Sequence, residues 1–551
     1  MKSTLTFILI IYSLAVQSQL QKLFDREVMY QHFSGVVLVE ANDGSMFKYY
    51  HGKKGDESSV EFNTLFDIGS ITKQFTAAGI LHLVADEKFD LHDRINPLLG
   101  KYASDRWDKV TVHQLLTHTS GIPSVYQTEQ GLELFFPEEK SLSRTALISR
   151  FSDGKLLFSP GEEFSYSNSG YILLAAIIEE ASGKNYEAFM QEMFKSYGLS
   201  KTYFNPTGDE AKPYYGYRND LLKKAPIYHH SWFLGAGGVY STVNDLSKWV
   251  GIITSETFLT SDLRKKFLKP HTNSGYGYGW VHNDGIISHD GGNAGFMSRL
   301  SFNPKIMEKV IILTNRSFED LKKYGKSAEY INRLSDKCWA HLNGKDIEVL
   351  PEVVESEAPE NLRFANGITL ERVDTLLMVH VKGNYPTRLV NNTPLEGKDE
   401  LEKKMIDIAN YLEKKKYWSL AKHCDGEMKF VMYSGMMAIG MRMMKKQTGG
   451  ADEFIPYFVD DSHGLIRMKG PEGILDLIVY FDDEGRIQGM FEHGFYEEDK
   501  EVAMITYPIG NRLYFIDGLP YGEKSVTLKI TDESLSVYQL NRVLDFRHQP
   551  N

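Results

Sequence analysis

A serine and a lysine stand three residues apart in the stretch FDIGSITKQF, which begins at Phe66. Side chains at positions i and i+3 are neighbours on a helix, so Ser70 and Lys73 are expected to lie together. A serine hydroxyl is a poor nucleophile until a base takes its proton, and a lysine can be that base once its pKa is lowered. The backbone N–H of Ser70 can also stabilise an oxyanion. The pair therefore predicts nucleophilic attack on a carbonyl group.

The same two residues also have a purely structural interpretation. Ser70 can cap the helix that follows it, and Lys73 can be a solvated charge. Ser-x-x-Lys recurs at Ser152, next to an Asp-Gly turn, and at Ser419 in the C-terminal part of the chain. Only Ser70 precedes a long apolar rhythm, through residue 81, which predicts a helix with one face in the core. This context favours Ser70 and Lys73 as a functional pair on another face of that helix.

Two further polar motifs can complete a catalytic site. PGEEFSYSNSGY places Tyr166 and Asn168 at the end of a loop before a helix, and ISHDGGNAGF places His289 and Gly291 on or beside a strand. Tyr-x-Asn also occurs elsewhere in the chain and is weak by itself, whereas His-x-Gly occurs only at His289. The combination therefore indicates catalysis more strongly than any one motif.

The strands and helices that must position these motifs follow a clear order. Residues 33–52 read as a strand, an Asn-Asp-Gly turn and a second strand, which predicts a hairpin. Helical patterns dominate from residue 71 to about residue 250. Strands are then predicted in YGYGW, GIISHDGG, GFMSRLSFNP and EKVIILTNRS. Strands at both ends with helices between them predict an α/β fold of the α+β type, with an antiparallel sheet covered by helices.

A change of composition divides the chain after about residue 345. Residues 19–345 are expected to form the domain that carries the motifs, and the acidic, proline-containing residues 346–395 a connecting segment. Residues 396–551 read as a C-terminal α+β domain with amphipathic helices and a strand hairpin around residues 482–485. The two cysteines are too few for a disulfide framework, and whether they pair stays open.

The N-terminus has the features of a secretory signal peptide, assigned to residues 1–18. Lys2 precedes an apolar run and small residues that fit a cleavage site. The run is shorter than the roughly 20 residues that a membrane span needs, and an uncleaved anchor is the alternative. The sequence therefore predicts a periplasmic or secreted protein without a transmembrane segment after cleavage.

Charge and ligand patterns narrow the expected partners. The formal net charge of -11 and the pI near 5.9 argue against nucleic acid or an anionic membrane. No His-Glu-x-x-His or paired Cys-x-x-Cys motif occurs, so no metal or other cofactor is expected. His113 and His118, which flank a predicted helix end, are interpreted as structural polar contacts. A small molecule or short peptide is the expected substrate, and the oligomeric state is open.

Together these motifs resemble those of the serine β-lactamase-related family, which includes class C β-lactamases, penicillin-binding carboxypeptidases, D-aminopeptidases and esterases. The resemblance covers roughly residues 30–340. It implies an antiparallel sheet with helices on both faces plus an all-helical lobe, with the active site between them. Residues 399–492 resemble, by pattern alone, the cone-like fold of the nuclear transport factor superfamily. The family motifs are, in chain order, Ser70-x-x-Lys73, LLTHTSGIP, Tyr166-x-Asn168, GAGGVYSTVNDLSKW and His289-x-Gly291.

The resemblance implies a role for each residue of the site. Ser70 would be the acylated nucleophile and Lys73 its activating partner, while Tyr166 would carry protons to and from the leaving group. Asn168 would hold a substrate amide or the lysine. The backbone N–H groups of Ser70 and Gly292, which follows the His-x-Gly motif, would form the oxyanion hole.

His289 departs from the family pattern, in which Lys-Thr-Gly begins with a lysine. That lysine supplies a permanent positive charge near a substrate carboxylate, whereas a histidine does so only when protonated. D-aminopeptidases and some esterases of the family carry His-x-Gly instead, as His289 and Gly291 do here. The resemblance therefore implies a serine hydrolase that forms an acyl-enzyme with small esters or short peptides containing D-amino acids. The alternatives are a penicillin-binding D-Ala-D-Ala carboxypeptidase and a slow-turnover sensor of cell-wall peptides.

Overall fold

A computed structural model divides the chain into two compact units, Met1–Leu350 and Pro351–Asn551. In the first unit the structure describes residues 19–30, 32–55, 58–127, 141–204, 208–217, 222–317 and 321–350. In the second it describes residues 351–353, 362–364, 368–373, 376–382, 394–425, 441, 445, 448–451, 453–459, 463–471, 473–482, 484–496, 501–510, 513–516, 526–530, 534–539 and 542–547.

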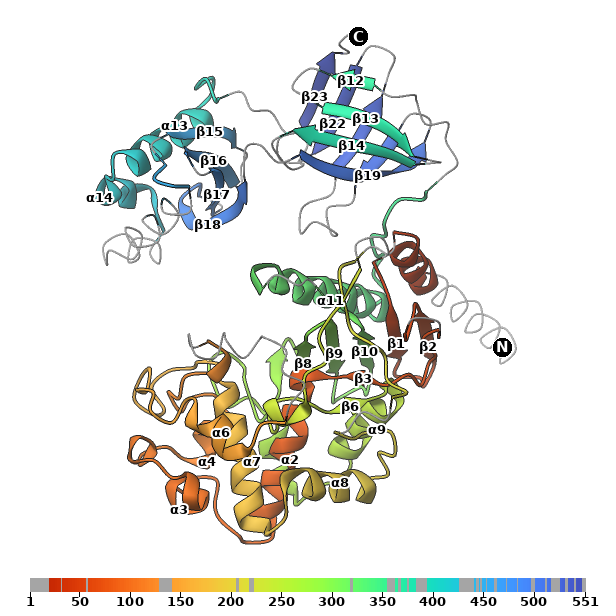
Figure 1. Cartoon of the computed structure of the whole chain (residues 1–551), viewed down its shortest axis with the longest axis vertical. Helices are drawn as coiled ribbons and strands as arrows, with labels where there is room; N and C mark the ends of the chain where they lie inside the picture. Colours follow the sequence, from red (N-terminus) through yellow and green to blue (C-terminus); the bar gives the residue numbers. More distant parts are fainter. Residues whose placement is uncertain are drawn as a thin grey trace, which may run out of the picture. The chain divides into compact units, whose positions relative to one another are not determined.

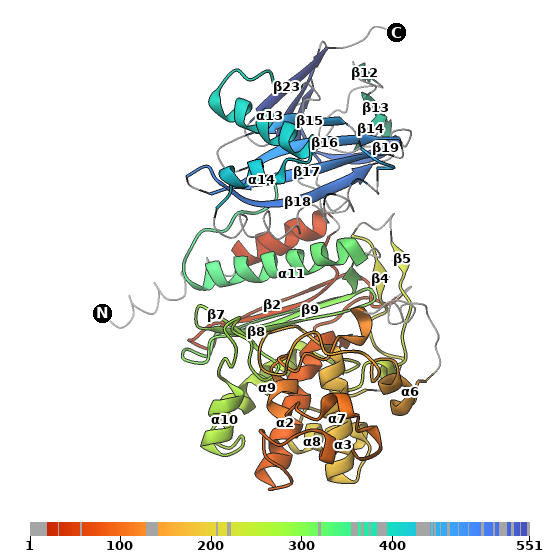
Figure 2. The same cartoon turned by 90° about the vertical axis from the view of Figure 1, so that its left-hand side faces the viewer.

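The centre of the first unit is a six-stranded antiparallel sheet in the order β2-β1-β10-β9-β8-β7. Helix α11 covers one face of this sheet, and the lobe that contains α2 and α7 lies on the other (Figures 1 and 2). The predicted antiparallel sheet between helices is confirmed. Its strands are β1 (Gly35–Glu40), β2 (Met46–His51), β7 (Val281–Asn283), β8 (Ile286–Asn293), β9 (Phe296–Phe302) and β10 (Lys309–Thr314).

The predicted hairpin at the start of the sheet is also confirmed. Strands β1 and β2 pair from Gly35 opposite His51 to Glu40 opposite Met46. Gly44 turns the chain between them with a φ of 81°, a conformation that glycine adopts without steric cost. Strand β1 is buried along nearly its whole length, whereas β2 alternates between buried and exposed residues because it forms the edge of the sheet.

Helices dominate the chain between β2 and β7, as predicted. They are α2 (Thr72–Ala85), α3 (Asn96–Leu99), α4 (Val112–Leu116), α6 (Arg144–Ser149), α7 (Asn168–Ser182), α8 (Tyr186–Ser196), α9 (Val243–Thr254) and α10 (Ser261–Phe267), and α11 (Leu321–Leu342) follows the sheet. The 3₁₀ turn η1 (Gly69–Ile71) precedes α2, and the short strands are β3 (Phe66–Asp67), β4 (Tyr214–Tyr215), β5 (Lys223–Lys224), β6 (Tyr240–Ser241) and β11 (Arg316–Ser317).

Helix α2 differs from the helix with one buried face that its apolar rhythm predicts. Its polar residues Lys73 and Gln74 are fully buried, together with most of the helix. The reason is that α7, α8 and α10 all pack against it. Lys73 therefore lies in the interior of the lobe, and its interpretation as a solvated charge is wrong.

The stretch YGYGW, expected as a strand, is a loop between α10 and β7. Only Tyr276 makes an isolated bridge, to Val281. Gly279 has a φ of 79°, which strands do not adopt. The strand prediction is wrong because the aromatic residues Tyr276, Tyr278 and Trp280 alternate with glycines in the sequence, which imitates a strand, although all five residues are buried in a loop.

The second unit contains two antiparallel sheets in its described residues, ordered β15-β16-β17-β18 and β12-β13-β14-β19-β20-β21-β22-β23. Helix α13 packs against the first of them. The predicted hairpin is confirmed as β17 and β18. Residues 362–364, 368–373 and 376–382, which the sequence assigns to a connecting segment, form three strands of the second sheet. The domain boundaries and the likeness to a cone-like fold stay predictions.

The elements of the second unit have the following bounds. Its helices are α13 (Glu400–Glu413) and α14 (Tyr417–Leu420). The strands of its four-stranded sheet are β15 (Glu453–Val459), β16 (His463–Gly470), β17 (Gly473–Phe481) and β18 (Ile487–Tyr496). The strands of its other sheet are β12 (Leu362–Phe364), β13 (Ile368–Val373), β14 (Leu376–Lys382), β19 (Glu501–Gly510), β20 (Leu513–Ile516), β21 (Val526–Ile530), β22 (Ser534–Gln539) and β23 (Arg542–Arg547).

The remaining sequence features concern bonding and location. Neither Cys338 nor Cys424 forms a disulfide, and both thiols are buried. The predicted signal peptide, residues 1–18, lies outside the described residues. Within the described ranges, no helix has the length and apolar character needed to cross a membrane.

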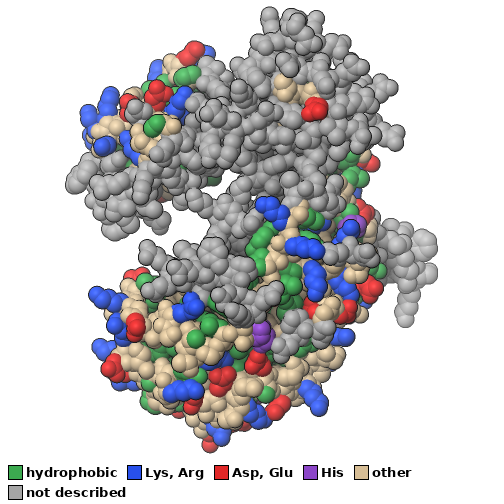
Figure 3. Space-filling model, in the orientation of Figure 1, with side chains coloured by type: hydrophobic (Ala, Val, Ile, Leu, Met, Phe, Trp, Pro, Cys, Tyr) green, Lys and Arg blue, Asp and Glu red, His purple; other side chains and the backbone are tan. Residues whose placement is uncertain are grey.

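Charge on the visible surface of the first unit is mixed. Figure 3 shows basic and acidic side chains interspersed over the described residues of one face. Charges of opposite sign partly cancel beyond the Debye length of about 8 Å at physiological salt. The described part of this face therefore presents no strong field of one sign.

Candidate active site

Ser70 lies in the turn η1, between β3 and helix α2. Its hydroxyl does not cap α2, whose N-cap residue is Ile71 and has no side-chain hydrogen bond. The interpretation of Ser70 as a helix cap is therefore wrong. Gly69 has a φ of 50°, and a Cβ atom there would collide with the backbone of Gly292. Glycine thus allows strand β8 to approach the turn that carries Ser70.

The amine of Lys73 contacts three oxygen atoms. Its Nζ lies 2.9 Å from Ser70 Oγ, 2.8 Å from Asn168 Oδ1 and 2.8 Å from the carbonyl oxygen of Ala236. No carboxylate is among these partners. Burial lowers the pKa of Lys73 well below its ordinary value, so the neutral amine is favoured.

The three contacts also indicate where the lone pair of this neutral amine points. The oxygens of Asn168 and Ala236 only accept, and they engage the two N–H groups of the amine. Asn168 keeps its oxygen towards Lys73 because its Nδ2 donates to Ser124 Oγ at 3.3 Å. The lone pair is then left for the Ser70 hydroxyl, which can donate to it. Lys73 is thereby arranged as a base for Ser70.

Tyr166 contacts the same serine oxygen from another element. Its hydroxyl donates to Ser70 Oγ at 2.9 Å. Burial raises the pKa of Tyr166, although the hydrogen bond with Ser70 opposes this shift. The phenol is therefore protonated at neutral pH. One serine oxygen thus lies between a neutral amine that can accept a proton and a phenol that can give one.

Strand β8 approaches the turn that carries Ser70 so closely that no side chain fits between them. A Cβ atom on Gly291 would overlap the carbonyl oxygen of Ile68 and the hydroxyl of Ser298. Ser298 Oγ also donates to that carbonyl at 2.9 Å. Gly291 is therefore required by close packing, and the packing brings the backbone of Gly292 next to the turn at Gly69.

A buried carboxylate fastens the turn to the strand. Asp67 accepts from the backbone N–H of Gly69 and from Nδ2 of Asn293, each at 2.7 Å. Burial raises the pKa of Asp67 to about 6, although both hydrogen bonds oppose the shift. Gly69 stands directly before Ser70 and Asn293 directly after Gly292. Asp67, which binds both, therefore limits how far apart the two backbone N–H groups expected to form the oxyanion hole can lie.

His289 lies on β8, with its ring centroid 6.2 Å from that of Tyr166. Its Nδ1 is 2.6 Å from the carbonyl oxygen of Asp290, and its Nε2 is 3.0 Å from the hydroxyl of Tyr276. Burial lowers the pKa of His289 to about 4, so the imidazole is neutral at neutral pH. Its recorded hydrogen bonds are to these two residues and not to Ser70.

His118 holds the segment that carries Tyr166 and Asn168. Its Nδ1 accepts from the backbone N–H of Ser167 at 3.1 Å, and its carbonyl oxygen accepts from the N–H of Ser165 at 2.9 Å. Its ring lies against that of Tyr166, with centroids 4.3 Å apart. His118 therefore has the predicted structural role, since it binds the backbone next to the Tyr-x-Asn motif and packs against Tyr166.

Replacing His118 tests whether its side-chain hydrogen bond, rather than the packing of its ring, positions the Tyr-x-Asn segment. We expect His118→Ala to lower kcat roughly 10- to 100-fold with little change in KM, because small displacements of catalytic groups are costly. His118→Asn should recover much of the loss, since Asn offers an acceptor at the same distance from the backbone. Asn also tolerates the φ of 57° at this position. Equal kcat values for the two variants would contradict a positioning role.

Four of the residues predicted from sequence are in mutual contact. Ser70 touches Lys73 and Tyr166, and Lys73 also touches Asn168. Gly291 and Gly292 lie against the turn that carries Ser70, as the oxyanion-hole prediction requires. His289 makes no hydrogen bond to Ser70 and instead binds Tyr276 and Asp290. Their chemical roles stay predictions.

Sequence analysis missed several residues that support the site. These are Asp67, Asn293, Tyr276 and, as a direct support of Tyr166, His118. Asp67 and Asn293 lie next to the Ser-x-x-Lys and His-x-Gly motifs, and this position could have marked them as site residues. Their pairing, however, is not visible in the sequence. Tyr276 was missed because the strand predicted for YGYGW gave no reason to place its hydroxyl against His289.

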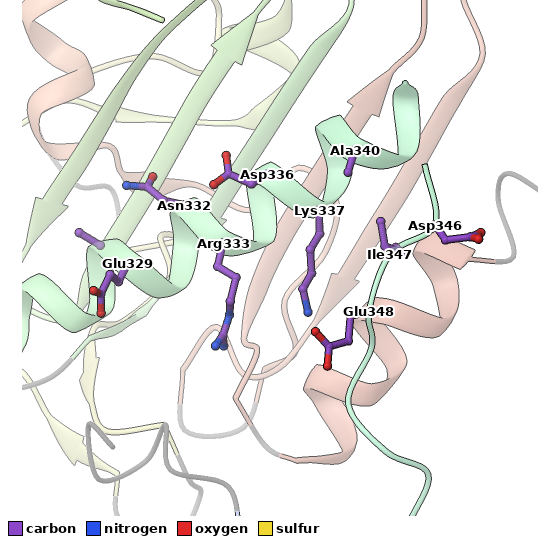
Figure 4. Close-up of a pocket in the computed structure, with 10 residues that line it drawn as sticks. Glu329, Asn332, Arg333, Asp336, Lys337, Ala340, Asp346, Ile347 and Glu348 are labelled. Atoms are coloured by element: carbon purple, nitrogen blue, oxygen red, sulfur yellow. The ribbon is translucent and has the colours of Figure 1, made fainter. Parts of the chain in front are cut away.

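A groove of about 670 Å³ lies elsewhere on the first unit, along α11 and residues 346–348. Arg333, Lys337 and Glu348 point into the same space (Figure 4). None of the predicted catalytic residues lines it. One lining residue, Asn332, donates to the Asp290 carboxylate at 3.1 Å and so reaches strand β8 from the face opposite the active site.

Comparisons with known proteins identify the family of the first unit. Residues 20–329 match the family model described as Beta-lactamase. The chain is 26% identical over 352 residues to Penicillin-binding protein 4* of Bacillus subtilis, covering 57% of this chain and 76% of that protein. It is 24% identical to D-alanyl-D-alanine-carboxypeptidase/endopeptidase AmpH of Escherichia coli, covering 57% of this chain and 86% of that protein.

A solved structure shares the fold. D-amino acid amidase from Ochrobactrum anthropi SV3, complexed with D-phenylalanine, matches with a TM-score of 0.53 and 20% identity. The match covers 60% of this chain and 100% of that chain. It supports the antiparallel sheet and helical lobe that position the contacts around Ser70.

Proposed function

The chain belongs to the beta-lactamase family of serine hydrolases, and on that premise we propose that it forms an acyl-enzyme on Ser70 with small esters or short peptides containing D-amino acids. The observation that carries the proposal is the position of Ser70 Oγ, 2.9 Å from both Lys73 Nζ and Tyr166 OH. Such an arrangement activates the serine and supplies a proton for the leaving group.

In the proposed acylation step, Ser70 Oγ attacks the carbonyl carbon while its proton moves to the lone pair of Lys73. The carbonyl oxygen becomes an oxyanion and is stabilised by the backbone N–H groups of Ser70 and Gly292. Collapse of the tetrahedral intermediate breaks the bond to the leaving group, which takes a proton from Tyr166. The proton held by Lys73 then restores Tyr166, so the enzyme loses no proton.

In the proposed deacylation step, water replaces the leaving group and the same transfers run in reverse. Water gives its proton to the neutral amine of Lys73 as its oxygen attacks the acyl carbon. Breakage of the ester bond then returns the proton to Ser70 Oγ. Asn168 keeps the Lys73 amine in place throughout, through the contact at 2.8 Å.

The substrate class is proposed from the relatives and from His289. One relative is named as a D-alanyl-D-alanine carboxypeptidase and endopeptidase, and a structural neighbour as a D-amino acid amidase. Both names support a carbonyl substrate with a D-amino acid. A neutral His289 favours an ester or an amide over a substrate that needs a cation at this position.

The second candidate is a penicillin-binding carboxypeptidase or a sensor that accepts cell-wall peptides and releases them slowly. The relatives named as a penicillin-binding protein and as a carboxypeptidase favour it. The two functions share acylation of Ser70 and differ in the preferred substrate and in the rate of deacylation.

A substrate panel tests the proposal. Short-chain p-nitrophenyl esters, D-amino acid amides, D-Ala-D-Ala peptides and a chromogenic cephalosporin are incubated with wild type and with Ser70→Ala. We expect hydrolysis of esters or D-amino acid amides that disappears in the variant. Preferred release of D-alanine from the dipeptide, or a stable penicillin adduct, would favour the second candidate.

Replacing His289 with lysine tests its neutral role. We expect His289→Lys to reduce hydrolysis of esters and D-amino acid amides and to increase acylation by penicillin, because it introduces a positive charge. In wild type, activity that needs the neutral imidazole rises as pH passes the His289 pKa of about 4. Above that pH, titration of His289 causes no further change in activity. Stopped-flow acylation rates and a pH profile measure both effects.

The opposite pH behaviour would contradict this role. A wild-type protein that hydrolyses cephalosporin efficiently and loses that activity above about pH 7 would indicate that His289 acts as a cation. If His289→Lys kept the substrate preference of wild type, residue 289 would not influence the choice of substrate.

We also propose that the protein acts outside the cytoplasm. The support is the signal-like sequence of residues 1–18. Cell fractionation, with the N-terminal residue of the mature protein determined by mass spectrometry, tests this location. Intact residues 1–18 on the mature protein would contradict cleavage.

A further inference from the structure

Tyr276 is a buried residue that the proposed mechanism does not use, yet it contacts His289 beside the nucleophile. Its exposed fraction is 3%, and that of His289 is 5%. It comes from the loop between α10 and β7, whereas His289 comes from β8. Their hydrogen bond therefore joins the loop to the strand that also carries Gly291 and Gly292.

The contacts of His289 define which ring nitrogen carries the proton. A carbonyl oxygen only accepts, so Nδ1 carries hydrogen and donates to Asp290. In a neutral imidazole Nε2 is then an acceptor, and the hydroxyl of Tyr276 donates to it. Tyr276 thus occupies the only lone pair through which His289 could take up a second proton.

The surroundings of Tyr276 hold its ring beside His289, and its hydroxyl also lies within hydrogen-bond reach of Tyr171. Its backbone N–H donates to Thr272 Oγ1 at 2.9 Å. Its ring packs against those of His118 and Phe164, with centroids 4.6 Å and 5.6 Å apart. Because the ring is enclosed, it cannot turn away from His289 without disturbing the wall that also supports Tyr166.

The basic side chains tied to the site are each neutral or already paired. Lys73 lies among three oxygen atoms, and its burial favours the neutral amine. Arg299 on β9 pairs with the carboxylate of Asp290. A carboxylate beside Ser70 therefore finds no unpaired cation among these groups, and its desolvation is not compensated.

We propose that Tyr276 is a positioning residue that determines the charge preference of the site, by holding His289 as a neutral imidazole with both nitrogens engaged. The inference rests on the proposed acyl-enzyme function of Ser70. The site then selects acyl compounds that are uncharged beside the reacting carbonyl, such as amides and esters. It discriminates against compounds with a carboxylate there.

The groups around His289 decide how it responds when the tyrosine hydroxyl is removed. They are Lys73, His118, Tyr166, Tyr276, Asp290 and Arg299. Of these, Tyr276 alone donates to Nε2. Its replacement by phenylalanine keeps the ring and opens Nε2, so protonation of the imidazole becomes favourable when a carboxylate binds.

Two competitors that differ in one group provide the test. N-acetyl-D-alanine and N-acetyl-D-alanine amide are compared as inhibitors of p-nitrophenyl acetate hydrolysis by the full-length protein. In wild type we expect the amide to inhibit more strongly. The ratio of the two inhibition constants should be the same at about pH 5.5 and about pH 8, because the acid is ionised throughout this range.

In Tyr276→Phe we expect the preference for the amide to fall about tenfold at pH 5.5 and less at pH 8. The reason is that His289 Nε2 loses the hydrogen bond from Tyr276 and can instead be protonated, which low pH favours. Tyr278→Phe is the matched control. Tyr278 is also a buried tyrosine of this loop, but its hydroxyl contacts His113 at 2.8 Å instead of His289. The preference in that variant should equal that of wild type.

Several outcomes would overturn the inference. They are an unchanged preference in a folded Tyr276→Phe, an equal change in Tyr278→Phe, and a wild type that the amide does not inhibit. If Tyr276→Phe does not fold, the wild-type ratio decides, and a stronger preference for the acid at pH 5.5 than at pH 8 contradicts the proposal. Absence of ester hydrolysis and of labelling at Ser70 instead refutes the proposed function.

Discussion

Ser70→Ala is expected to abolish covalent labelling and to reduce hydrolysis by on the order of 10⁴- to 10⁶-fold, as loss of a catalytic nucleophile does. The fold should remain intact, because the change removes one oxygen from a partly exposed side chain and no core volume. Lys73 and Tyr166 each lose one partner, so the free energy of unfolding should fall by about 1–3 kcal/mol. Thermal unfolding and labelling by a fluorophosphonate probe measure the two effects.

The chain provides a matched control for this variant. Ser152 also precedes a lysine by three residues, but it lies outside helix α2 and the contacts around Ser70. Ser152→Ala should keep both labelling and hydrolysis. Loss of labelling in Ser152→Ala, or its persistence in Ser70→Ala, would remove the assignment of the nucleophile.

Lys73→Met is expected to slow acylation roughly 10²- to 10⁴-fold, the usual contribution of a general acid or base. Methionine fills a similar volume and has no basic nitrogen, so the variant isolates the chemistry from the cavity that alanine would leave. Lys73→Arg should be similarly slow, because its guanidinium stays charged and cannot accept the serine proton. Single-turnover acylation by an activated ester measures these rates.

The pH dependence of acylation distinguishes a base from a fixed charge. Burial lowers the pKa of Lys73, so the active neutral amine is present above the lowered pKa and is lost as pH falls through it. The wild-type acylation rate should therefore fall on the acidic side. A rate that instead falls as pH rises through neutrality, or near-normal acylation by Lys73→Met, would exclude Lys73 as the base.

The contact between Ser70 and Lys73 was predictable because its geometry is local. Residues three apart on a helix must be neighbours, and the structure keeps Ser70 and Lys73 in contact even though a 3₁₀ turn precedes α2. The burial of Lys73 was not predictable from the same pattern. Periodicity identifies the apolar positions of a helix, but it does not tell how many neighbouring helices cover the polar ones.

The supporting contacts were beyond sequence analysis because they join distant segments. Asp67 and Asn293 are 226 residues apart, and their pairing depends on how the sheet closes between β1 and β10. Tyr276 and His289 are only 13 residues apart, but the loop between them takes a left-handed turn at Gly279. Strand periodicity cannot reveal such a turn when the buried aromatic residues alternate.

Peptide mapping after labelling tests the central proposal most directly. The full-length protein is incubated with a serine-directed fluorophosphonate probe, digested and analysed by tandem mass spectrometry. The expected result is one adduct, on the tryptic peptide GDESSVEFNTLFDIGSITK, with the fragment ions placing it on Ser70. An adduct on another residue, or no adduct on a protein that hydrolyses p-nitrophenyl esters, would contradict the proposal that Ser70 carries the acyl group.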